Sequence, residues 1–173
     1  MSKDRDKKIL MIIASQKFRD EELWVPKKHF EINGFDVTIA SSRVEPSKGM
    51  LGAVVTPDIV LKNIRVEDYQ GVIFVGGNGA TEYWEDPLAH RIAQQAFKEN
   101  KILGAICIAP VILAKAGLLK GRKATVWPSE LEQLKNNGAI LTAEDVVRDD
   151  KIITANGPEA ASQFAQTIME SLT

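Results

Sequence analysis

The chain has little of the residues that build disulfide frameworks and metal sites: one cysteine and two histidines among 173 residues. A single cysteine excludes an intramolecular disulfide and is typical of a reducing compartment, so we expect a cytoplasmic protein. Two distant histidines and one cysteine form no ligand cluster, so we expect no metal and no cofactor. No apolar run approaches the ~20 residues of a membrane span, and none near the charged start is long enough for a signal peptide. We therefore expect no membrane partner.

Neither sign of charge is in excess, since 22 Lys and Arg stand against 23 Asp and Glu, for a net charge of −1. Nucleic-acid binding requires a basic excess or a basic face, so this balance argues against a nucleic-acid partner. Hydrophobic residues make up 45% of the chain, which is ordinary for a globular protein with a full core. We expect a charged N-terminal tail over residues 1–7 and a single domain over residues 8–173.

Short apolar runs alternate with amphipathic segments along most of the sequence. This alternation predicts an α/β fold with a mostly parallel sheet and helices on both faces. The segment 41–63 lacks helical periodicity and predicts short strands or a hairpin outside the main sheet. The Asp149-Asp150 pair predicts a hairpin between 146–148 and 151–155. The other predicted strands are 9–14, 35–40, 72–75, 102–106, 123–127 and 139–141, and the predicted helices are 20–33, 87–99, 110–117, 129–137 and 158–172.

Cys107 lies between a predicted strand and a predicted helix, with Ala105 and Ala109 two positions to either side. This spacing is typical of a nucleophile elbow, a sharp turn that presents one side chain to a cleft. A thiol there faces the positive end of a helix dipole, so we expect its pKa to be lowered. The alternative is an inert, buried cysteine.

Sites in such sheets lie beyond the carboxyl ends of the strands, so the loops after Ala14, Val75, Ile106 and Ala155 should surround one cleft. The second of these loops contains Gly76-Gly77-Asn78-Gly79. Adjacent glycines allow backbone N–H groups to converge on an anion, or simply form a tight turn with positive φ.

The acidic run Asp20-Glu21-Glu22 opens a predicted helix, where carboxylates are favoured, and we interpret Asp20 in this way. A glutamate turned inward toward the cysteine would be kept protonated by burial and would serve as an acid and base. Trp127 ends a predicted strand and either lines the cleft or packs in the core.

Four motifs in this order resemble the ThiJ/PfpI superfamily, and in particular its YajL and DJ-one branches, over nearly the whole chain from Lys8 to Leu172. They are Glu22-Leu-Trp-Val-Pro26, Phe74-Val-Gly-Gly-Asn78, Ala105-Ile-Cys-Ile-Ala-Pro110 and Thr154-Ala-Asn-Gly-Pro158. The resemblance implies a flavodoxin-like three-layer sandwich that forms homodimers or larger assemblies.

The resemblance also implies roles for individual residues. It assigns the nucleophile to Cys107 and its acidic partner to Glu22 rather than Glu21. The oxyanion or anion pocket would comprise Gly76, Gly77 and Ile108, and the cleft wall Asn78, Trp127, Gly157 and Pro158.

Two positions depart from the pattern of the superfamily. The protease-like branch has a histidine directly after the cysteine, where this chain has Ile108. The DJ-one branch has a histidine before a proline, where this chain has Trp127. Amide hydrolysis is put in doubt, because the leaving amine needs a proton donor.

Three functions follow, in this order. The first is a cofactor-free enzyme in which Cys107 attacks small reactive carbonyls, as a glyoxalase or deglycase does, with Glu22 as the proton shuttle. The second is a redox-sensing or chaperone-like protein that responds to oxidation of Cys107. The third is an intracellular cysteine peptidase or amidase, which needs a histidine supplied in space by His29, His90 or a partner subunit.

Overall fold

A computed structural model describes residues 7–172. Residues 1–6 of the predicted tail, and Thr173, lie outside the described residues. The strands and helices are β1 (Lys8–Ile12), α1 (Asp20–Ile32), β2 (Asp36–Ser41), β3 (Ser47–Lys48), β4 (Val54–Val55), β5 (Ile59–Val60), β6 (Gly71–Phe74), α2 (Pro87–Lys98), β7 (Ile102–Ile106), α3 (Pro110–Lys115), β8 (Lys123–Ala124), α4 (Leu131–Asn136), β9 (Ile140–Leu141), β10 (Val146–Asp149), β11 (Ile152–Ala155) and α5 (Ala161–Leu172).

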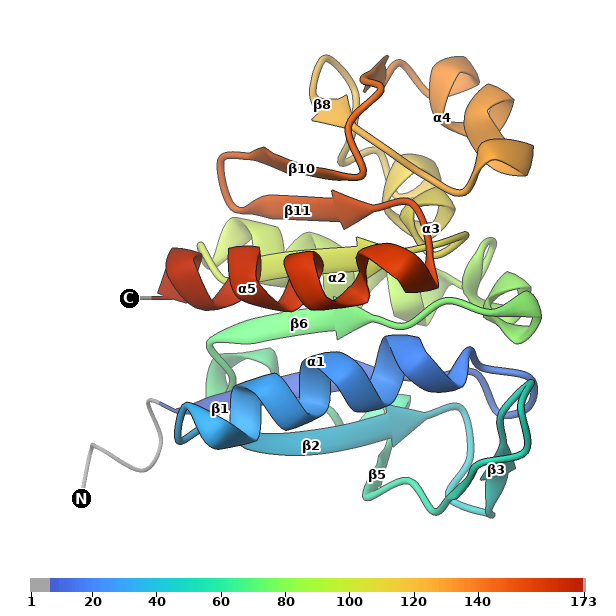
Figure 1. The fold of residues 1–173 in the computed structure, drawn as a ribbon, viewed down its shortest axis with the longest axis vertical. Helices are drawn as coiled ribbons and strands as arrows, with labels where there is room; N and C mark the ends of the chain where they lie inside the picture. The colour runs from blue at the N-terminus through green and yellow to red at the C-terminus, as the bar shows by residue number, and fades with distance from the viewer. Residues whose placement is uncertain (1–6, 173) are drawn as a thin grey trace.

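A seven-stranded sheet forms the centre of the fold, in the order β10-β11-β7-β6-β1-β2-β5. Every neighbouring pair is parallel except β10 and β11. Helices α1 and α5 lie in front of the sheet, and α2 and α3 lie behind it (Figure 1). The three-layer, flavodoxin-like α/β sandwich is therefore confirmed.

The side chains of each central strand alternate between two hydrophobic layers, as the pleat requires. In β1, Ile9 and Met11 belong to the layer that contains Phe164 of α5. Leu10 and Ile12 belong to the opposite layer. All four are fully buried. A strand buried on both faces reads as a continuous apolar run, which is why β1, β6 and β7 were predictable.

Several predicted elements are two or three residues shorter in the structure, and two segments differ more clearly from the prediction. The apolar piece at 59–60 was expected outside the main sheet but forms β5 at its edge, because Asp58 fastens it to β2: the Asp58 carboxylate accepts the N–H of Ile39, and the Asp58 N–H donates to the Ile39 carbonyl. The strand expected over 123–127 ends at Ala124. There the Thr125 N–H donates to the Thr154 hydroxyl, so it is not available to a strand ladder.

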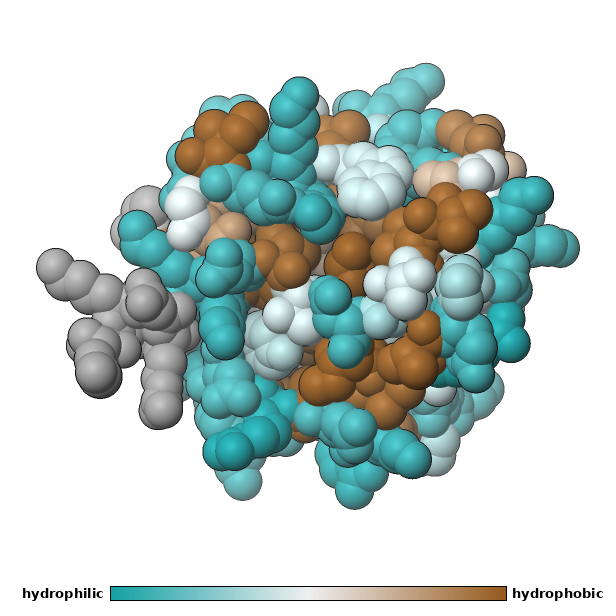
Figure 2. All heavy atoms as spheres, turned by 90° about the horizontal axis from the view of Figure 1, so that it is seen from below, coloured by the Kyte–Doolittle hydropathy of each residue, from teal (hydrophilic) through white to brown (hydrophobic). Residues whose placement is uncertain are grey.

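The hairpin β10–β11 and the separate two-stranded sheet β3–β4 agree with the prediction. Figure 2 views the molecule from the β2–β5 edge and shows apolar side chains in patches among polar ones. Within residues 7–172, no helix is both long enough and apolar enough to cross a bilayer.

Candidate active site

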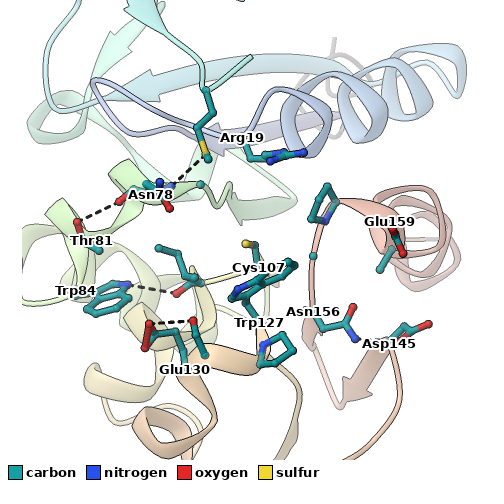
Figure 3. Close-up of a pocket in the computed structure, with 18 residues that line it drawn as sticks. Arg19, Asn78, Thr81, Trp84, Cys107, Trp127, Glu130, Asp145, Asn156 and Glu159 are labelled. Carbon is teal, nitrogen blue, oxygen red and sulfur yellow. Dashed lines mark hydrogen bonds between the residues drawn. The ribbon is translucent and has the colours of Figure 1, made fainter. Parts of the chain in front are cut away.

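A pocket of about 770 Å³ lies beyond the carboxyl ends of the parallel strands (Figure 3). It is bordered by loops that follow β6, β7 and β11, by the residue before α1 and by the turn between β3 and β4. The lining residues are Arg19, Met50, Gly77, Asn78, Thr81, Trp84, Cys107, Ile108, Trp127, Pro128, Ser129, Glu130, Asp145, Asn156, Gly157, Pro158, Glu159 and Ala160.

Cys107 occupies the sharp turn between β7 and α3, with a backbone φ of +66°. This left-handed conformation is rare for a residue with a side chain and persists only where the surroundings impose it. The Cys107 N–H donates to the Ala155 carbonyl at 2.9 Å, and the Cys107 carbonyl accepts the Trp127 N–H at 2.8 Å. These bonds to two separate segments hold the turn, and the thiol is 8% exposed at the pocket surface.

Glu22 lies on the inward face of α1 and is fully buried. Among the described residues, neither of its carboxyl oxygens has a hydrogen-bond partner of ordinary geometry. The polar groups that face it are the Cys107 thiol and the Gly76 N–H. Glu21, by contrast, points outward and pairs with Arg19 at 2.6 Å. The helix therefore directs Glu22, and not Glu21, toward the cysteine.

Burial raises the pKa of Glu22 to about 8, and the opposing effects of Cys107, Gly76 and Arg19 are smaller. Burial and the charge of Glu22, once it is ionised, raise the pKa of the Cys107 thiol to about 12. The predicted lowering of the thiol pKa is therefore wrong in direction. The reason is that α3 spans only six residues, whereas the sulfur is largely desolvated beside a carboxyl group. At neutral pH both groups hold their protons.

Two backbone N–H groups, those of Gly77 and Ile108, face the Cys107 sulfur and favour its charged form. Gly77 has a φ of +104°, and a Cβ there would lie 2.3 Å from the backbone nitrogen of Arg19. Gly76 was expected in the same anion pocket, but its N–H faces Glu22 instead. A Cβ on Gly76 would lie 2.5 Å from Glu22 Oε1 and 2.6 Å from Cys107 Cβ. Only glycine leaves room for this pair to meet.

The four residues expected in the cleft wall all line the pocket: Asn78, Trp127, Gly157 and Pro158. The Trp127 ring packs so closely on Gly157 that a Cβ on the glycine would lie 2.9 Å from ring carbons. Trp127 is nevertheless 43% exposed, so its ring is a wall of the pocket and not a core residue.

Sequence reasoning missed several residues of the pocket, among them Arg19, Met50 and Trp84. The Trp84 indole N–H donates to the Ile108 carbonyl at 3.3 Å and so supports the residue after the nucleophile. The only sequence feature that could have pointed to Arg19 is its position directly before the acidic run Asp20-Glu21-Glu22. Met50 comes from the segment predicted to lie away from the main sheet, so nothing in the sequence pointed to it.

Neither histidine lines the pocket. The Nε2 atom of His90 lies 2.7 Å from the Trp84 carbonyl oxygen, and His29 is in the last turn of α1. Over residues 7–172, no group of three or more His, Cys, Asp or Glu side chains is arranged to hold a metal ion.

The model of the DJ-1/PfpI family matches residues 7–171. The crystal structure of a ThiJ/PfpI domain protein from Brachyspira murdochii superimposes with a TM-score of 0.94 at 29% sequence identity, and the match covers 95% of each chain.

Three sequence relatives are similar over most of their length. An uncharacterized protein of Methanocaldococcus jannaschii is 39% identical over 171 residues, covering 97% of this chain and 83% of that protein. A glutathione-independent glyoxalase of Caenorhabditis elegans is 28% identical over 166 residues, covering 96% and 89%. A deglycase of Pyrococcus horikoshii is 30% identical over 151 residues, covering 87% and 90%.

Proposed function

Because the chain belongs to the DJ-1/PfpI family, we propose that it consumes small reactive carbonyl compounds through Cys107. The observation that carries this proposal is the pairing of a lone thiol at the pocket surface with a fully buried carboxyl group that has no other strong partner. Relatives named as a glyoxalase and as deglycases support the same class of substrate.

In the first step the Cys107 sulfur forms a bond to the aldehyde carbon, and the π bond of the carbonyl breaks so that its electron pair passes to the oxygen. The thiol proton passes to one oxygen of Glu22, while the proton already on Glu22 passes to the new alkoxide. The product is a neutral hemithioacetal. A carboxyl group held in its protonated form suits this exchange, because it donates from one oxygen and accepts at the other.

With methylglyoxal, the proton on the former aldehyde carbon then moves to the neighbouring carbon, and the hydroxyl proton moves to the oxygen of that neighbour, which gives the thioester of lactate. Water hydrolyses the thioester, so that one methylglyoxal and one water give one lactate and the free thiol. The N–H groups of Gly77 and Ile108 stabilise negative charge that develops near the sulfur. No external oxidant or cofactor is needed. In a deglycase reaction, the same addition would begin on a carbonyl adduct of an amine or a thiol.

The test is lactate release from methylglyoxal by the wild-type protein and by Cys107→Ala. We expect turnover in the wild type and none in the variant. Equal lactate release by the two proteins would refute the proposal. As a control, the circular dichroism spectrum of the variant should match that of the wild type and so show that the variant is folded.

A redox-sensing role is the second candidate, and the N–H groups at the sulfur are the observation that favours it. They would stabilise the oxygens of an oxidised cysteine, and no second cysteine exists to form an intramolecular disulfide. The raised thiol pKa slows such oxidation and places this role second. Intact mass after mild peroxide treatment tests it, and an unchanged mass would count against it.

The third function, a peptidase or amidase, gains no support from the placement of His29 and His90, because neither lines the pocket.

We also propose that the chain forms a homodimer, as the resemblance implies. Trp24, Val25 and Ile32 of α1 are 41%, 38% and 74% exposed, which is unusual for large apolar side chains on one helix. Light scattering after size-exclusion chromatography measures the mass directly. A monomeric mass at working concentration would overturn this proposal.

A further inference from the structure

The hairpin β3–β4 is fastened to the segment that leads into α1. The Lys17 N–H donates to the Lys48 carbonyl at 2.7 Å, and the Met50 N–H donates to the Phe18 carbonyl at 2.8 Å. These bonds join two segments that are about 30 residues apart in the sequence and place the tip of the hairpin beside the pocket.

Asp20 strengthens this attachment with both of its carboxylate oxygens. Oδ1 accepts the Leu51 N–H at 2.9 Å, and Oδ2 accepts the Ala53 N–H at 2.8 Å. The side chain is 6% exposed, so these charge-assisted bonds are largely shielded from water. Asp20 is thus more than a favourable charge in the first turn of a helix, which is all that its sequence position indicated.

The turn is built closely around this carboxylate. A Cβ on Gly49 would lie 2.3 Å from Asp20 Oδ1, so any residue other than glycine would overlap the Asp20 carboxylate. The Gly49 N–H donates to the Ala53 carbonyl at 2.7 Å and closes the turn. Residue 50 therefore has a defined position, although it belongs to a surface hairpin.

This position places Met50 in the wall of the Cys107 pocket. Its sulfur accepts the Asn78 N–H at 3.4 Å, and Figure 3 shows this bond as a dashed line to the labelled Asn78. Met50 and Asn78 also line a second pocket of about 380 Å³, whose other residues include Lys17 and Lys48. The Met50–Asn78 contact therefore separates the two pockets.

We propose that Met50 is a specificity-determining residue that limits how far the group attached to the reacting carbonyl extends toward Asn78, and that Asp20 is the positioning residue that holds Met50 there. A methyl substituent fits within the pocket as it stands. The pocket as a whole has room for a larger group, but a phenyl ring that extends from the reacting carbonyl toward Asn78 meets the Met50 side chain, which lies between this pocket and the second one. The selectivity for carbonyl substrates rests on the proposed function, whereas the access of reagents to Cys107 does not.

The first test compares methylglyoxal with phenylglyoxal. In Met50→Ala, the ratio of kcat/KM for phenylglyoxal to that for methylglyoxal should rise by about tenfold or more, the usual effect of a few carbon atoms in a pocket. Leu51→Ala is the matched control, since this neighbouring side chain is 61% exposed and does not line the pocket. The control should keep the wild-type ratio. An unchanged ratio in Met50→Ala would overturn the proposal.

The second test asks whether Asp20 affects selectivity by holding Met50 in position. Asp20→Asn replaces one accepting oxygen with a donor and so loosens the hairpin, and its substrate ratio should move in the same direction as that of Met50→Ala. The double variant should show the same ratio as Met50→Ala alone, because Asp20 acts only through the position of Met50. Additive changes in the ratio would contradict this, as would an Asp20→Asn protein that loses stability but keeps the wild-type ratio.

A third test needs no turnover. Cys107 is the only cysteine, so its alkylation by small iodoacetamide and by bulky N-phenylmaleimide can be followed by intact mass. Met50→Ala should accelerate the bulky reagent relative to the small one, and Leu51→Ala should not. If the wild type consumes no aldehyde but this ratio changes as expected, the proposed function fails and the role of Met50 stands. If aldehyde is consumed and neither ratio changes, the role of Met50 fails alone.

Discussion

Replacing Glu22 with glutamine should change how the stability of the protein depends on pH. Burial raises the pKa of Glu22 from 4.5 to about 8, so between these values the folded chain holds a proton that the unfolded chain has released. The free energy of unfolding falls with pH wherever the native state binds more protons. The stabilising effect of this proton is complete below pH 4.5 and is lost as the pH rises through about 8.

The magnitude follows from 1.36 kcal/mol for each pKa unit. Glu22 is fully buried, so screening by solvent does not reduce the effect. From about pH 5 to about pH 8, the wild-type protein should lose about 3 kcal/mol more than Glu22→Gln does. Above that interval the thiol titrates in the unfolded chain of both proteins, so the comparison ends there.

Urea unfolding at a series of pH values, followed by far-UV circular dichroism, provides the measurement. Glu21→Gln is the matched control, because it removes the neighbouring carboxyl group, which pairs with Arg19 at the surface. We expect the control to keep the wild-type slope. If Glu22→Gln also kept it, Glu22 would not be the group that burial keeps protonated, and the reasoning would be refuted.

Three further substitutions test the packing of the site and of the adjoining core. Gly76→Ala should lower the free energy of unfolding by about 1–3 kcal/mol, measured by urea unfolding, because its Cβ overlaps Glu22 and Cys107; an unchanged value would refute the packing described. Tyr83→Phe should destabilise by about 1–3 kcal/mol, since the Tyr83 hydroxyl donates to the Ile13 carbonyl at 2.7 Å and accepts the Ser42 N–H at 3.0 Å; thermal unfolding without loss of stability would contradict this. Trp127→Ala should raise KM for aldehydes by about tenfold with a smaller effect on kcat, because the ring is a pocket wall while the backbone N–H to Cys107 is retained; steady-state kinetics with an unchanged KM would argue against that role.

Most of the fold was predictable because the central strands are buried on both faces and therefore read as apolar runs in the sequence. The elbow at Cys107 was predictable for a related reason, since small residues are needed on both sides of so sharp a turn. Ala105 and Ala109 are both fully buried there. The edge strand β5 was not predictable, because a side-chain contact from Asp58 fixes it rather than a hydrophobic pattern.

The protonation states of Glu22 and Cys107, and the complete set of residues that line the pocket, could not be predicted from the sequence. Both depend on contacts between residues that are far apart in the sequence. The direction of the thiol pKa was missed, because the effect of burial beside Glu22 exceeds that of a short helix end. Met50 was missed because its place is set by bonds to Phe18 and Asn78, which are distant along the chain. Local sequence patterns do not predict such long-range bonds.

The pH dependence of kcat/KM for methylglyoxal, measured on the wild type and on Glu22→Gln, tests most directly the claim that Glu22 controls the proton of Cys107. In the wild type, kcat/KM should fall as the pH rises through about 8, because only protonated Glu22 can donate to the alkoxide while its other oxygen accepts the thiol proton. In Glu22→Gln this inflection should be absent and the rate near neutral pH much lower. The same inflection and the same rate in both proteins would contradict the account.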